Sequence, residues 1–344
     1  MTDPSSFEIG GQSFEPGQKG VVDLHIGSLI DYQPVTMSVH VRHSRKPGPT
    51  LLLTAGIHGD ELIGVEVLRR LLKSSRLKSL RGTLVVVPVV CMPAFLSRSR
   101  YLPDRRDLNR LFPGSPEGSL GARLAAAFAQ EVVTKCTHSI DFHAGAVGRP
   151  NLPQIRVSPE DEVGLELAKA FKPPVVIETT MRDGSLRSHL RSLGIPALLY
   201  EAGEAYRLDP AAVRYALRGI FGVMRHLEML PPSRRVSEPR TRTVIAGTTG
   251  WMRAPQGGIF TALKDLGNAI SEGTKLGHVA DPFGQKEIPI VSTVSGIIIG
   301  ITREATADEG DALFNIATTS NPERAEAHIQ RHDEVLEEHT DALH

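Results

Sequence analysis

The sequence has few cysteines, no excess of charge of either sign and no long apolar run. Its two cysteines, Cys91 and Cys136, are too few for a disulfide framework or for a zinc site built on cysteines. Both stand beside apolar, strand-like segments, so we expect buried free thiols in a reducing compartment. Lysine and arginine total 39, as do aspartate and glutamate, so the formal net charge is zero. Without a basic surface, nucleic acid and anionic membranes are disfavoured as partners.

The lack of long apolar segments bears on the location of the protein. No apolar run reaches the roughly 18 residues that a membrane-spanning helix needs, and the first residues show neither the basic nor the apolar region of a secretory signal. We therefore expect a cytoplasmic protein. The 344 residues are 40% apolar and 23% charged, which is typical of a globular protein. At about 150 residues a domain, this length suits two domains.

The first two thirds of the sequence alternate between strand and helix patterns. Residues 20–42 alternate apolar and polar side chains, which predicts an antiparallel hairpin at a sheet edge. The segments TLLLTAG and GTLVVVPVV are continuous apolar runs, typical of buried parallel strands. A helix between them is predicted from four apolar residues at helical spacing: Leu62, Val65, Leu68 and Leu72. Further helices are expected at 120–133, 159–171, 185–192 and 209–230, and further strands at 138–145, 173–178 and 196–204. This alternation predicts an α/β fold with one sheet covered on both faces.

The composition changes in the last third. Residues 231–243 have no long apolar run and are interpreted as a linker, and residues 244–317 hold short strand patterns without a convincing helix. We therefore divide the chain into an α/β domain (1–232), an all-β domain (238–318) and a charged tail (319–344) that is helical or disordered. Asn321 and Pro322 predict a helix start in the tail. Its histidines are expected in solvent rather than on a metal: His328, His332, His339 and His344.

Polar side chains follow the first buried strand, where ligands bind in open α/β sheets. His58 and Glu61 are three residues apart at the start of the next helix, so their side chains can converge on one point. By itself this spacing is also found where a histidine caps a helix and a glutamate faces solvent. His143 ends a second strand, before the small residues Ala144 and Gly145. Two histidines and a glutamate leave one position of a zinc ion open, as in catalytic sites.

A catalytic zinc site also needs a base and groups that hold the substrate. Glu201 ends a third strand and can take a proton from water. Asp141 lies two residues before His143 and either orients it or caps a chain end. The segment SRYLPDRRDLNRLFPG carries several basic and amide side chains, which either face solvent or hold a substrate carboxylate.

Four motifs in this order, GIHGDE, RDLNRLFPG, DFHAG and YEAGE, resemble the succinylglutamate desuccinylase/aspartoacylase family, a branch of the zinc carboxypeptidase-like enzymes. The likeness spans residues 47–230. It implies a three-layer α/β/α zinc-carboxypeptidase-like core with a mixed sheet. The zinc ligands would be His58, Glu61 and His143, with Glu201 as general base and acid.

The same resemblance implies how the substrate is held. Asn109 and Arg110 would bind the carboxylate of the amino-acid product, and Arg100 would polarise the scissile carbonyl, a role for which Arg105 and Arg106 compete. The all-β domain resembles the lipoyl/biotinyl-like barrel of longer bacterial members, but it lacks the lysine motif of a carrier. The resemblance also leads us to expect a homo-oligomer.

The implied function is that of a zinc-dependent hydrolase cleaving the amide bond of an N-acyl amino acid or a related small molecule. Two alternatives stay open: a metallocarboxypeptidase acting on peptides, and a non-catalytic binding protein that has kept the shape of a metal site. The sequence does not determine the acyl group or the amino acid. Residues 148–156, 180–189 and 203–209 are candidate pocket walls. Their arginines are available for an acidic group: Arg156, Arg182, Arg187 and Arg207.

Overall fold

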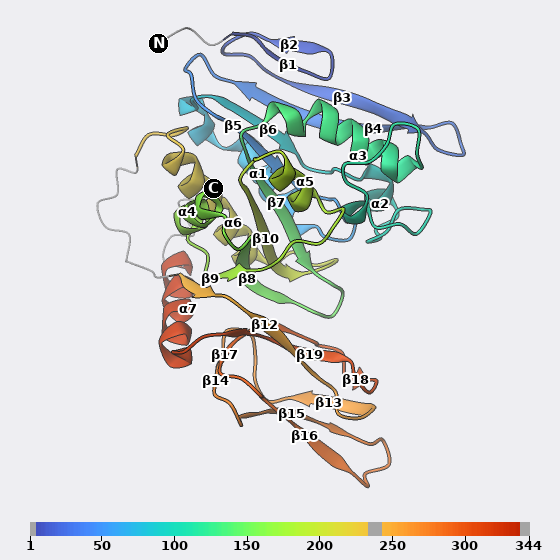
Figure 1. Ribbon diagram of the computed structural model, residues 1–344, viewed down its shortest axis with the longest axis vertical. Helices are drawn as coiled ribbons and strands as arrows, with labels where there is room; N and C mark the ends of the chain where they lie inside the picture. Colours follow the sequence, from blue (N-terminus) through green and yellow to red (C-terminus); the bar gives the residue numbers. More distant parts are fainter. Residues whose placement is uncertain (1–4, 233–242, 338–344) are drawn as a thin grey trace.

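A large mixed β-sheet runs through the molecule (Figure 1). The computed structural model describes residues 5–232 and 243–337. The N-terminal strands are β1 (Phe7–Ile9), β2 (Gln12–Phe14), β3 (Lys19–Ser28), β4 (Pro34–His43), β5 (Thr50–Thr54), β6 (Thr83–Val87), β7 (His138–Gly145), β8 (Asn151–Val157), β9 (Val175–Glu178) and β10 (Ala197–Glu204). The helices of this part are α1 (Ile63–Lys73), α2 (Met92–Leu96), α3 (Leu120–Glu131), α4 (Glu162–Phe171), α5 (Leu186–Ser192) and α6 (Pro210–His226), with short 3₁₀ helices η1 (Ser75–Ser79), η2 (Leu108–Arg110) and η3 (Val133–Lys135).

The C-terminal part consists of strands and one closing helix. Its elements are β11 (Val244–Ala246), β12 (Thr249–Arg253), β13 (Gly258–Ala262), β14 (Ala269–Ile270), β15 (Lys275–Ala280), β16 (Glu287–Val291), β17 (Gly296–Ile301), β18 (Thr306–Ala307), β19 (Ala312–Thr318) and α7 (Pro322–Glu337). The large sheet follows the order β12-β19-β17-β8-β10-β7-β5-β6-β4-β3, so strands of both parts belong to it. A second sheet has the order β16-β15-β13-β18.

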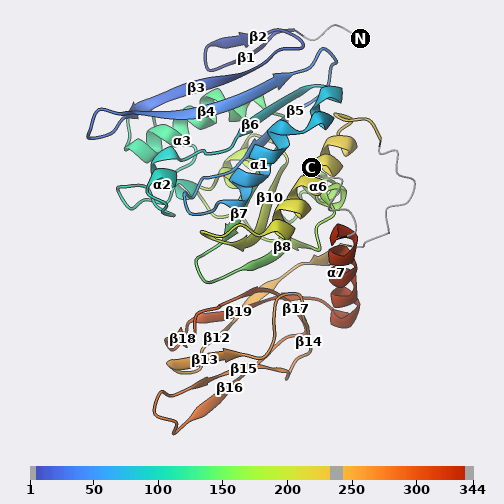
Figure 2. The ribbon, with the colours of Figure 1, turned by 180° about the vertical axis from the view of Figure 1, so that it is seen from behind.

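Helices cover both faces of the α/β part (Figure 2). On one face α1, α4 and α6 pack in the cluster that contains Leu51 and Leu53 of β5. On the other face α2, α3 and α5 pack in the cluster that contains Leu52 of the same strand. Successive strand residues point to opposite faces, so a strand buried on both sides is apolar throughout. This confirms the predicted α/β fold and its buried parallel strands, since β5 pairs in parallel with β6 and β7.

The sheet is mixed because an antiparallel hairpin forms one edge. Strands β3 and β4 pair antiparallel and β4 pairs antiparallel with β6, as predicted for residues 20–42. The helix predicted between the two buried strands is present as α1, although its buried face is shifted from the four apolar positions that predicted it. Ile63, Val67, Leu68 and Leu71 are fully buried, whereas Val65 and Leu72 are only partly buried. The buried face of α1 differs from the predicted apolar positions because this helix packs against both β7 and α6 rather than against a single layer.

Residues 148–156 contribute to the cavity wall, as predicted, but most of the segment is a strand rather than a loop. Residues Asn151–Val157 form β8, which lies antiparallel to β10. This strand was not recognised in the sequence because it contains Pro153, and proline cannot donate a backbone hydrogen bond within a sheet. In the structure it lies where the register of β8 and β10 shifts, between the pairs Glu201↔Gln154 and Gly203↔Asn151.

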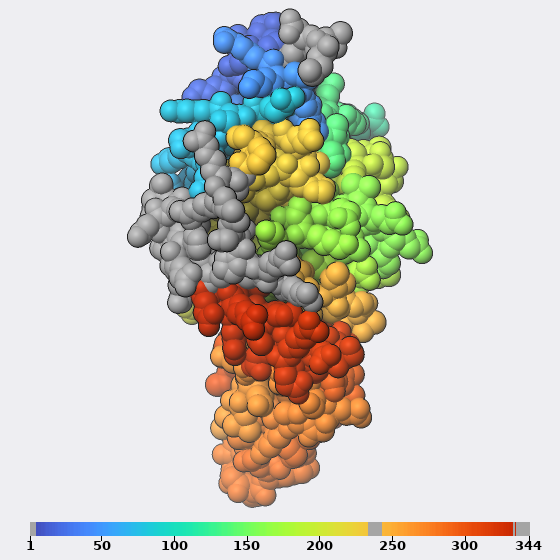
Figure 3. Space-filling model, turned by 90° about the vertical axis from the view of Figure 1, so that its left-hand side faces the viewer, coloured from blue at the N-terminus to red at the C-terminus, as the bar shows by residue number. Residues whose placement is uncertain are grey.

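The C-terminal part is all-β between residues 244 and 318, as predicted, and forms the narrow end of an elongated molecule (Figure 3). It is joined to the α/β part by two strand contacts: β11 pairs in parallel with β9, and Gly300 of β17 is opposite Asn151 of β8. Helix α7 begins at Pro322, as predicted, and its residues Ala325 and Ile329 pack in the apolar cluster at this junction.

Some predictions fall outside the described residues. The proposed domain limits at 232 and 238 border or enter the segment 233–242, so they stay a prediction. Of the tail histidines expected in solvent, His332 is instead buried, because α7 packs on α6 and places its ring 6.2 Å from that of Tyr215. His339 and His344 lie outside the described residues. Cys91 and Cys136 are free and buried, as expected, and burial raises the pKa of Cys91 to about 11. Among the described residues, no helix is both long and apolar enough to cross a membrane.

Candidate metal centre and active site

Two neighbouring parallel strands, β5 and β7, bring the predicted metal ligands together. His58 and Glu61 lie between β5 and α1, His143 lies near the carboxyl end of β7, and β7 pairs in parallel with both β5 and β10. Carboxyl ends of neighbouring parallel strands meet at one edge of a sheet, where ligands bind. One potential ligand atom from each of the three residues lies within 4.8 Å of the others, and all three residues are buried.

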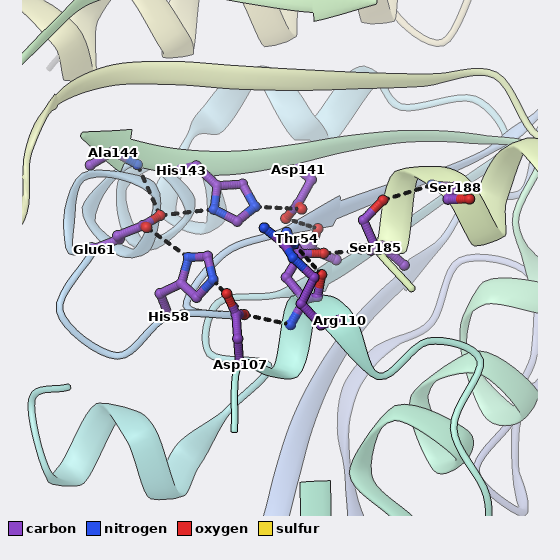
Figure 4. A network of polar contacts seen from close by, with 12 residues as sticks. Thr54, His58, Glu61, Asp107, Arg110, Asp141, His143, Ala144, Ser185 and Ser188 are labelled. Carbon is purple, nitrogen blue, oxygen red and sulfur yellow. Dashed lines mark hydrogen bonds and ion pairs between the residues drawn. The ribbon is translucent and has the colours of Figure 1, made fainter. Parts of the chain in front are cut away.

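Glu61 stands at the centre of this cluster (Figure 4). Its Oε1 is 2.6 Å from Nδ1 of His58 and its Oε2 is 2.8 Å from Nδ1 of His143. The backbone N–H of Ala144 also donates to Oε2, at 3.0 Å. The two imidazole Nδ1 atoms and the carboxylate therefore point at one another, and together they form the two-histidine, one-glutamate ligand set that suits zinc.

Carboxylates hold the far side of both imidazole rings (Figure 4). Nε2 of His143 is 2.8 Å from Asp141, whose other oxygen accepts from the hydroxyl of Thr54 at 2.7 Å. Nε2 of His58 is 3.0 Å from Oδ1 of Asp107. When Nε2–H donates to a carboxylate, Nδ1 is left free to bind a metal, which is the usual support of a zinc-bound histidine. Of the two roles open for Asp141, the structure therefore supports the orienting one.

Asp107 is a site residue that the sequence analysis did not select. It lies in the motif RDLNRLFPG, two residues before Asn109, and its role depends on the approach of this loop to His58. A carboxylate two residues before the predicted amide was the available signal. Its pKa is held well below the usual range because the His58 hydrogen bond and the charges of His58 and Arg100 outweigh burial.

Burial and charge act in opposite directions on the three central groups. Burial alone would raise the pKa of Glu61, but the adjacent imidazoles of His143 and His58 prevail and lower it strongly. Burial alone would lower the pKa of His143, but Asp141 and Glu61 raise it well above the ordinary value. The cluster therefore favours positive charge between the rings and the carboxylate. A divalent cation can supply that charge in place of protons.

Close backbone approach explains a glycine of the motif GIHGDE. A Cβ on Gly59 would lie 1.9 Å from the carbonyl oxygen of Ala94, and the N–H of Gly59 donates to Ser99 at 2.9 Å. A larger residue there would push the loop with His58 and Glu61 away from α2.

Glu201 lies beside the cluster in the second half of β10, three residues before the end of the strand. It is opposite His143 in the register of β10 and β7, and the pairing with both neighbouring strands becomes irregular directly after it. Such irregularities re-aim side chains at functional sites. Glu201 and the three candidate ligands line the same cavity, which has a volume of about 420 Å³.

The predicted substrate-binding residues also line this cavity. Arg100 donates to Glu61 at 3.2 Å and to Asp107 at 3.1 Å. Neither Arg105 nor Arg106 is in the cavity wall, and Arg106 pairs instead with Asp104 at 3.6 Å.

The residues predicted to bind a carboxylate stand further along the same wall. Asn109 accepts from the N–H of Leu186 at 2.9 Å, at the start of α5, which leaves its amide N–H groups for other partners. Arg110 donates to the carbonyl oxygen of Asn109. Both residues line the cavity, as do Arg156, Arg182 and Arg187, whereas Arg207 is outside it and pairs with Glu204 at 2.7 Å.

The C-terminal part contributes residues that the sequence analysis missed. Thr249 and Trp251 of β12 and Asn315 of β19 line the cavity together with Asn151 of β8. No pattern in the sequence pointed to Thr249, Trp251 or Asn315, since these residues reach the site only through the packing of the C-terminal part on the α/β part.

Known proteins resemble this chain in sequence. The family model described as the succinylglutamate desuccinylase/aspartoacylase catalytic domain matches residues 47–227. The chain is 26% identical over 284 residues to N-alpha-acetyl-L-2,4-diaminobutyric acid deacetylase of Halomonas elongata, a match that covers 79% of this chain and 83% of that protein. It is 35% identical over 102 residues to succinylglutamate desuccinylase of Pseudomonas syringae pv. tomato, which covers 27% of this chain and 30% of the relative.

Solved structures resemble it in fold over a greater length. The product-bound structure of the ectoine utilization protein EutE from Ruegeria pomeroyi has a TM-score of 0.78 at 25% identity and covers 88% of this chain and 95% of its own. The succinylglutamate desuccinylase/aspartoacylase from Rhodobacter sphaeroides has a TM-score of 0.77 at 24% identity, covering 87% and 95%, and supports the fold alone. The family model spans more than half of the chain and contains every predicted metal ligand. The chain therefore belongs to the succinylglutamate desuccinylase/aspartoacylase family.

Proposed function

We propose that this protein is a zinc-dependent hydrolase that cleaves the amide bond of an N-acyl amino acid. The observation that carries the proposal is the presence of the His58–Glu61–His143 cluster and Glu201 in the wall of one cavity. Its volume of about 420 Å³ suits a small molecule. The family includes deacylases, among them the diaminobutyric acid deacetylase of Halomonas elongata.

His58, Glu61 and His143 would hold the zinc ion, which when bound polarises a carbonyl and lowers the pKa of a water molecule to about 7. Glu201 accepts the proton of the attacking water at its carboxylate and delivers it to the nitrogen of the leaving amine. Arg100 stabilises the charge that develops on the carbonyl oxygen. Asn109 and Arg110 bind the carboxylate of the amino-acid part.

Metal content and a substrate panel test this function. We expect about one zinc ion per chain and hydrolysis that stops on chelation and returns with zinc, with faster release from N-acyl amino acids than from peptides. Faster release from peptides would identify a metallocarboxypeptidase instead. A protein that binds no metal and leaves every substrate intact would be a binding protein.

Two arginines of the cavity wall, Arg156 and Arg187, support a second anionic group on the substrate. Within the described residues, Nε of Arg156 and Nη1 of Arg187 are buried without a hydrogen-bond partner. Burial and the neighbouring charge of Arg156 lower the pKa of Arg187 to about 10. Both residues are half-buried, and two half-buried guanidinium groups that repel each other are stabilised by a shared anion; carboxylates match the guanidinium fork. We therefore assign a substrate with a second carboxylate, either in the acyl group or in the amino-acid side chain.

Replacement of Arg187 by methionine tests this assignment. We expect kcat/KM to fall about 10- to 100-fold for N-acetylaspartate or N-succinylglutamate, since a hydrogen bond to a charged group contributes about 1.5–3 kcal/mol. N-acetylalanine, without a second carboxylate, should lose less than about threefold. Arg207→Met is the matched control, because Arg207 is outside the cavity wall. Equal losses for acidic and neutral substrates would contradict the assignment.

The remaining predictions of the sequence stay proposals. The two buried thiols support the cytoplasm as the location of the protein. The likeness of the all-β region to a lipoyl/biotinyl-like barrel rests on its sequence pattern, and a homo-oligomer rests on the resemblance to the family.

A further inference from the structure

Asn151 occupies the junction between the catalytic strands and the C-terminal strands. As the first residue of β8, it is opposite Gly203 of β10 on one side and Gly300 of β17 on the other. The β17 contact is the point at which the large sheet passes from one part of the chain to the other. A substitution of Asn151 therefore alters contacts with both parts of the chain.

The amide of Asn151 contacts the proposed general base. Its Nδ2 donates to Oε2 of Glu201 at 3.1 Å. Within residues 5–232 and 243–337, this is the one side-chain donor to the Glu201 carboxylate. The strand pairing is irregular directly after Glu201 on both sides, so the backbone ladder does not hold this region in regular register. A glutamate side chain has three rotatable bonds, and a donor at its tip limits the positions of its oxygens.

Gly300 of β17 lies beside the Asn151 amide. A Cβ built on Gly300 would lie 3.1 Å from Oδ1 of Asn151, 3.2 Å from Cβ of Asn315 and 3.6 Å from the Trp251 ring. The amide oxygen therefore lies close to β17 at a position where any side chain larger than that of glycine would displace it. A carboxylate only accepts hydrogen bonds when ionised, so the nitrogen of the amide must face Glu201 and the oxygen must face Gly300.

We propose that Asn151 is a positioning residue for Glu201 and that the C-terminal β region, through Gly300, keeps its amide in place. The C-terminal part then takes part in catalysis by holding the base as well as by lining the cavity. This inference rests on the proposed function, because it needs Glu201 to act as the base.

Two substitutions of Asn151 show whether its hydrogen bond to Glu201 matters or whether its side chain only fills space. Asn151→Ala removes the donor, and Asn151→Asp keeps the shape but turns an acceptor toward the carboxylate. We expect kcat to fall about 10-fold for alanine and further, about 100-fold, for aspartate, with KM changed less than about threefold in both. A residue that only fills space gives the opposite order, with aspartate close to the native enzyme. Zinc-loaded protein and one N-acyl amino acid serve for all measurements.

Gly300→Ala tests the contact between β17 and Asn151 while the residue at position 151 stays asparagine. The added methyl must displace the Asn151 amide by a few tenths of an ångström, and we expect kcat to fall about 3- to 10-fold at unchanged KM. Asn268 provides the matched control, because its Nδ2 donates to Oε1 of Glu326 at 3.2 Å within the C-terminal part. Asn268→Ala and Asn268→Asp should leave kcat and KM unchanged, and the Tm of every variant reports loss of folding.

The outcomes distinguish this inference from the proposed function. If Glu201→Gln abolishes turnover while both Asn151 variants and Gly300→Ala keep native kcat, the inference is wrong and the proposed function stands. If the Asn151 variants raise KM at constant kcat, Asn151 binds substrate and the inference is again wrong. If Glu201→Gln itself retains native kcat, the assignment of the base fails. Should the Asn151 variants not fold, Gly300→Ala decides alone.

Discussion

Glu201→Gln is expected to lower kcat by about 1,000-fold or more, at nearly unchanged KM and zinc content. Glutamine keeps the shape of the side chain, but it cannot accept a proton from water, and a positioned general base typically contributes 10²- to 10⁴-fold. Glu201 serves as both base and acid in the proposed reaction, so the upper part of this range applies. The measurement is steady-state hydrolysis of an N-acyl amino acid with metal analysis of the same sample.

Glu204→Gln is the control for this result. Glu204 ends the same strand β10, three residues further on, but it pairs with Arg207 at 2.7 Å and is not in the cavity wall. Its substitution should leave kcat within about twofold. A Glu201→Gln enzyme that keeps a tenth or more of native kcat would show that another group moves the proton.

His143→Ala is expected to remove both zinc and activity. The substitution leaves Glu61 and His58 as the two remaining ligands, and catalytic zinc sites rest on three protein ligands. It also leaves Asp141 without its imidazole partner. We expect the zinc content after dialysis to fall to a small fraction of one ion per chain and hydrolysis to fall below detection, measured by elemental analysis and product release.

His138→Ala is the matched control for the metal ligand. His138 lies at the other end of the same strand β7 and is half-buried, with its Nδ1 2.9 Å from the hydroxyl of Thr137. Its loss should change neither zinc content nor kcat. Full zinc occupancy in the His143→Ala protein, with native activity, would contradict the assigned metal site.

The candidate metal ligands were predictable because each follows a local rule. His58, Glu61 and His143 stand where apolar strand patterns end, and parallel strands present those ends at one edge. Glu201 follows the same rule on β10. Asp141 was predictable as a neighbour because alternate strand residues share a face. The helix start at Pro322 was likewise a local signal.

Other parts of the site depend on long-range packing. Asp107 reaches His58 across 49 residues of sequence, and Asn151 reaches Glu201 across 50. Strand β8 escaped detection because Pro153 breaks the pattern that identifies a strand, although pairing with β10 tolerates it at a register shift. Arg100 and its neighbours Arg105 and Arg106 carry the same charge, and only the path of their loop distinguishes them.

Local sequence patterns were enough to predict the α/β class, the edge hairpin, the all-β character of the C-terminal part and the strand-end side chains of the candidate metal centre. These features depend on side-chain periodicity and on the geometry of parallel strands, which are written within a few consecutive residues. That Trp251 and Asn315 line the cavity, and that Gly300 lies beside Asn151, became apparent only from the three-dimensional structure. Those contacts join segments far apart in the chain, and their positions follow from the packing of the two parts on each other.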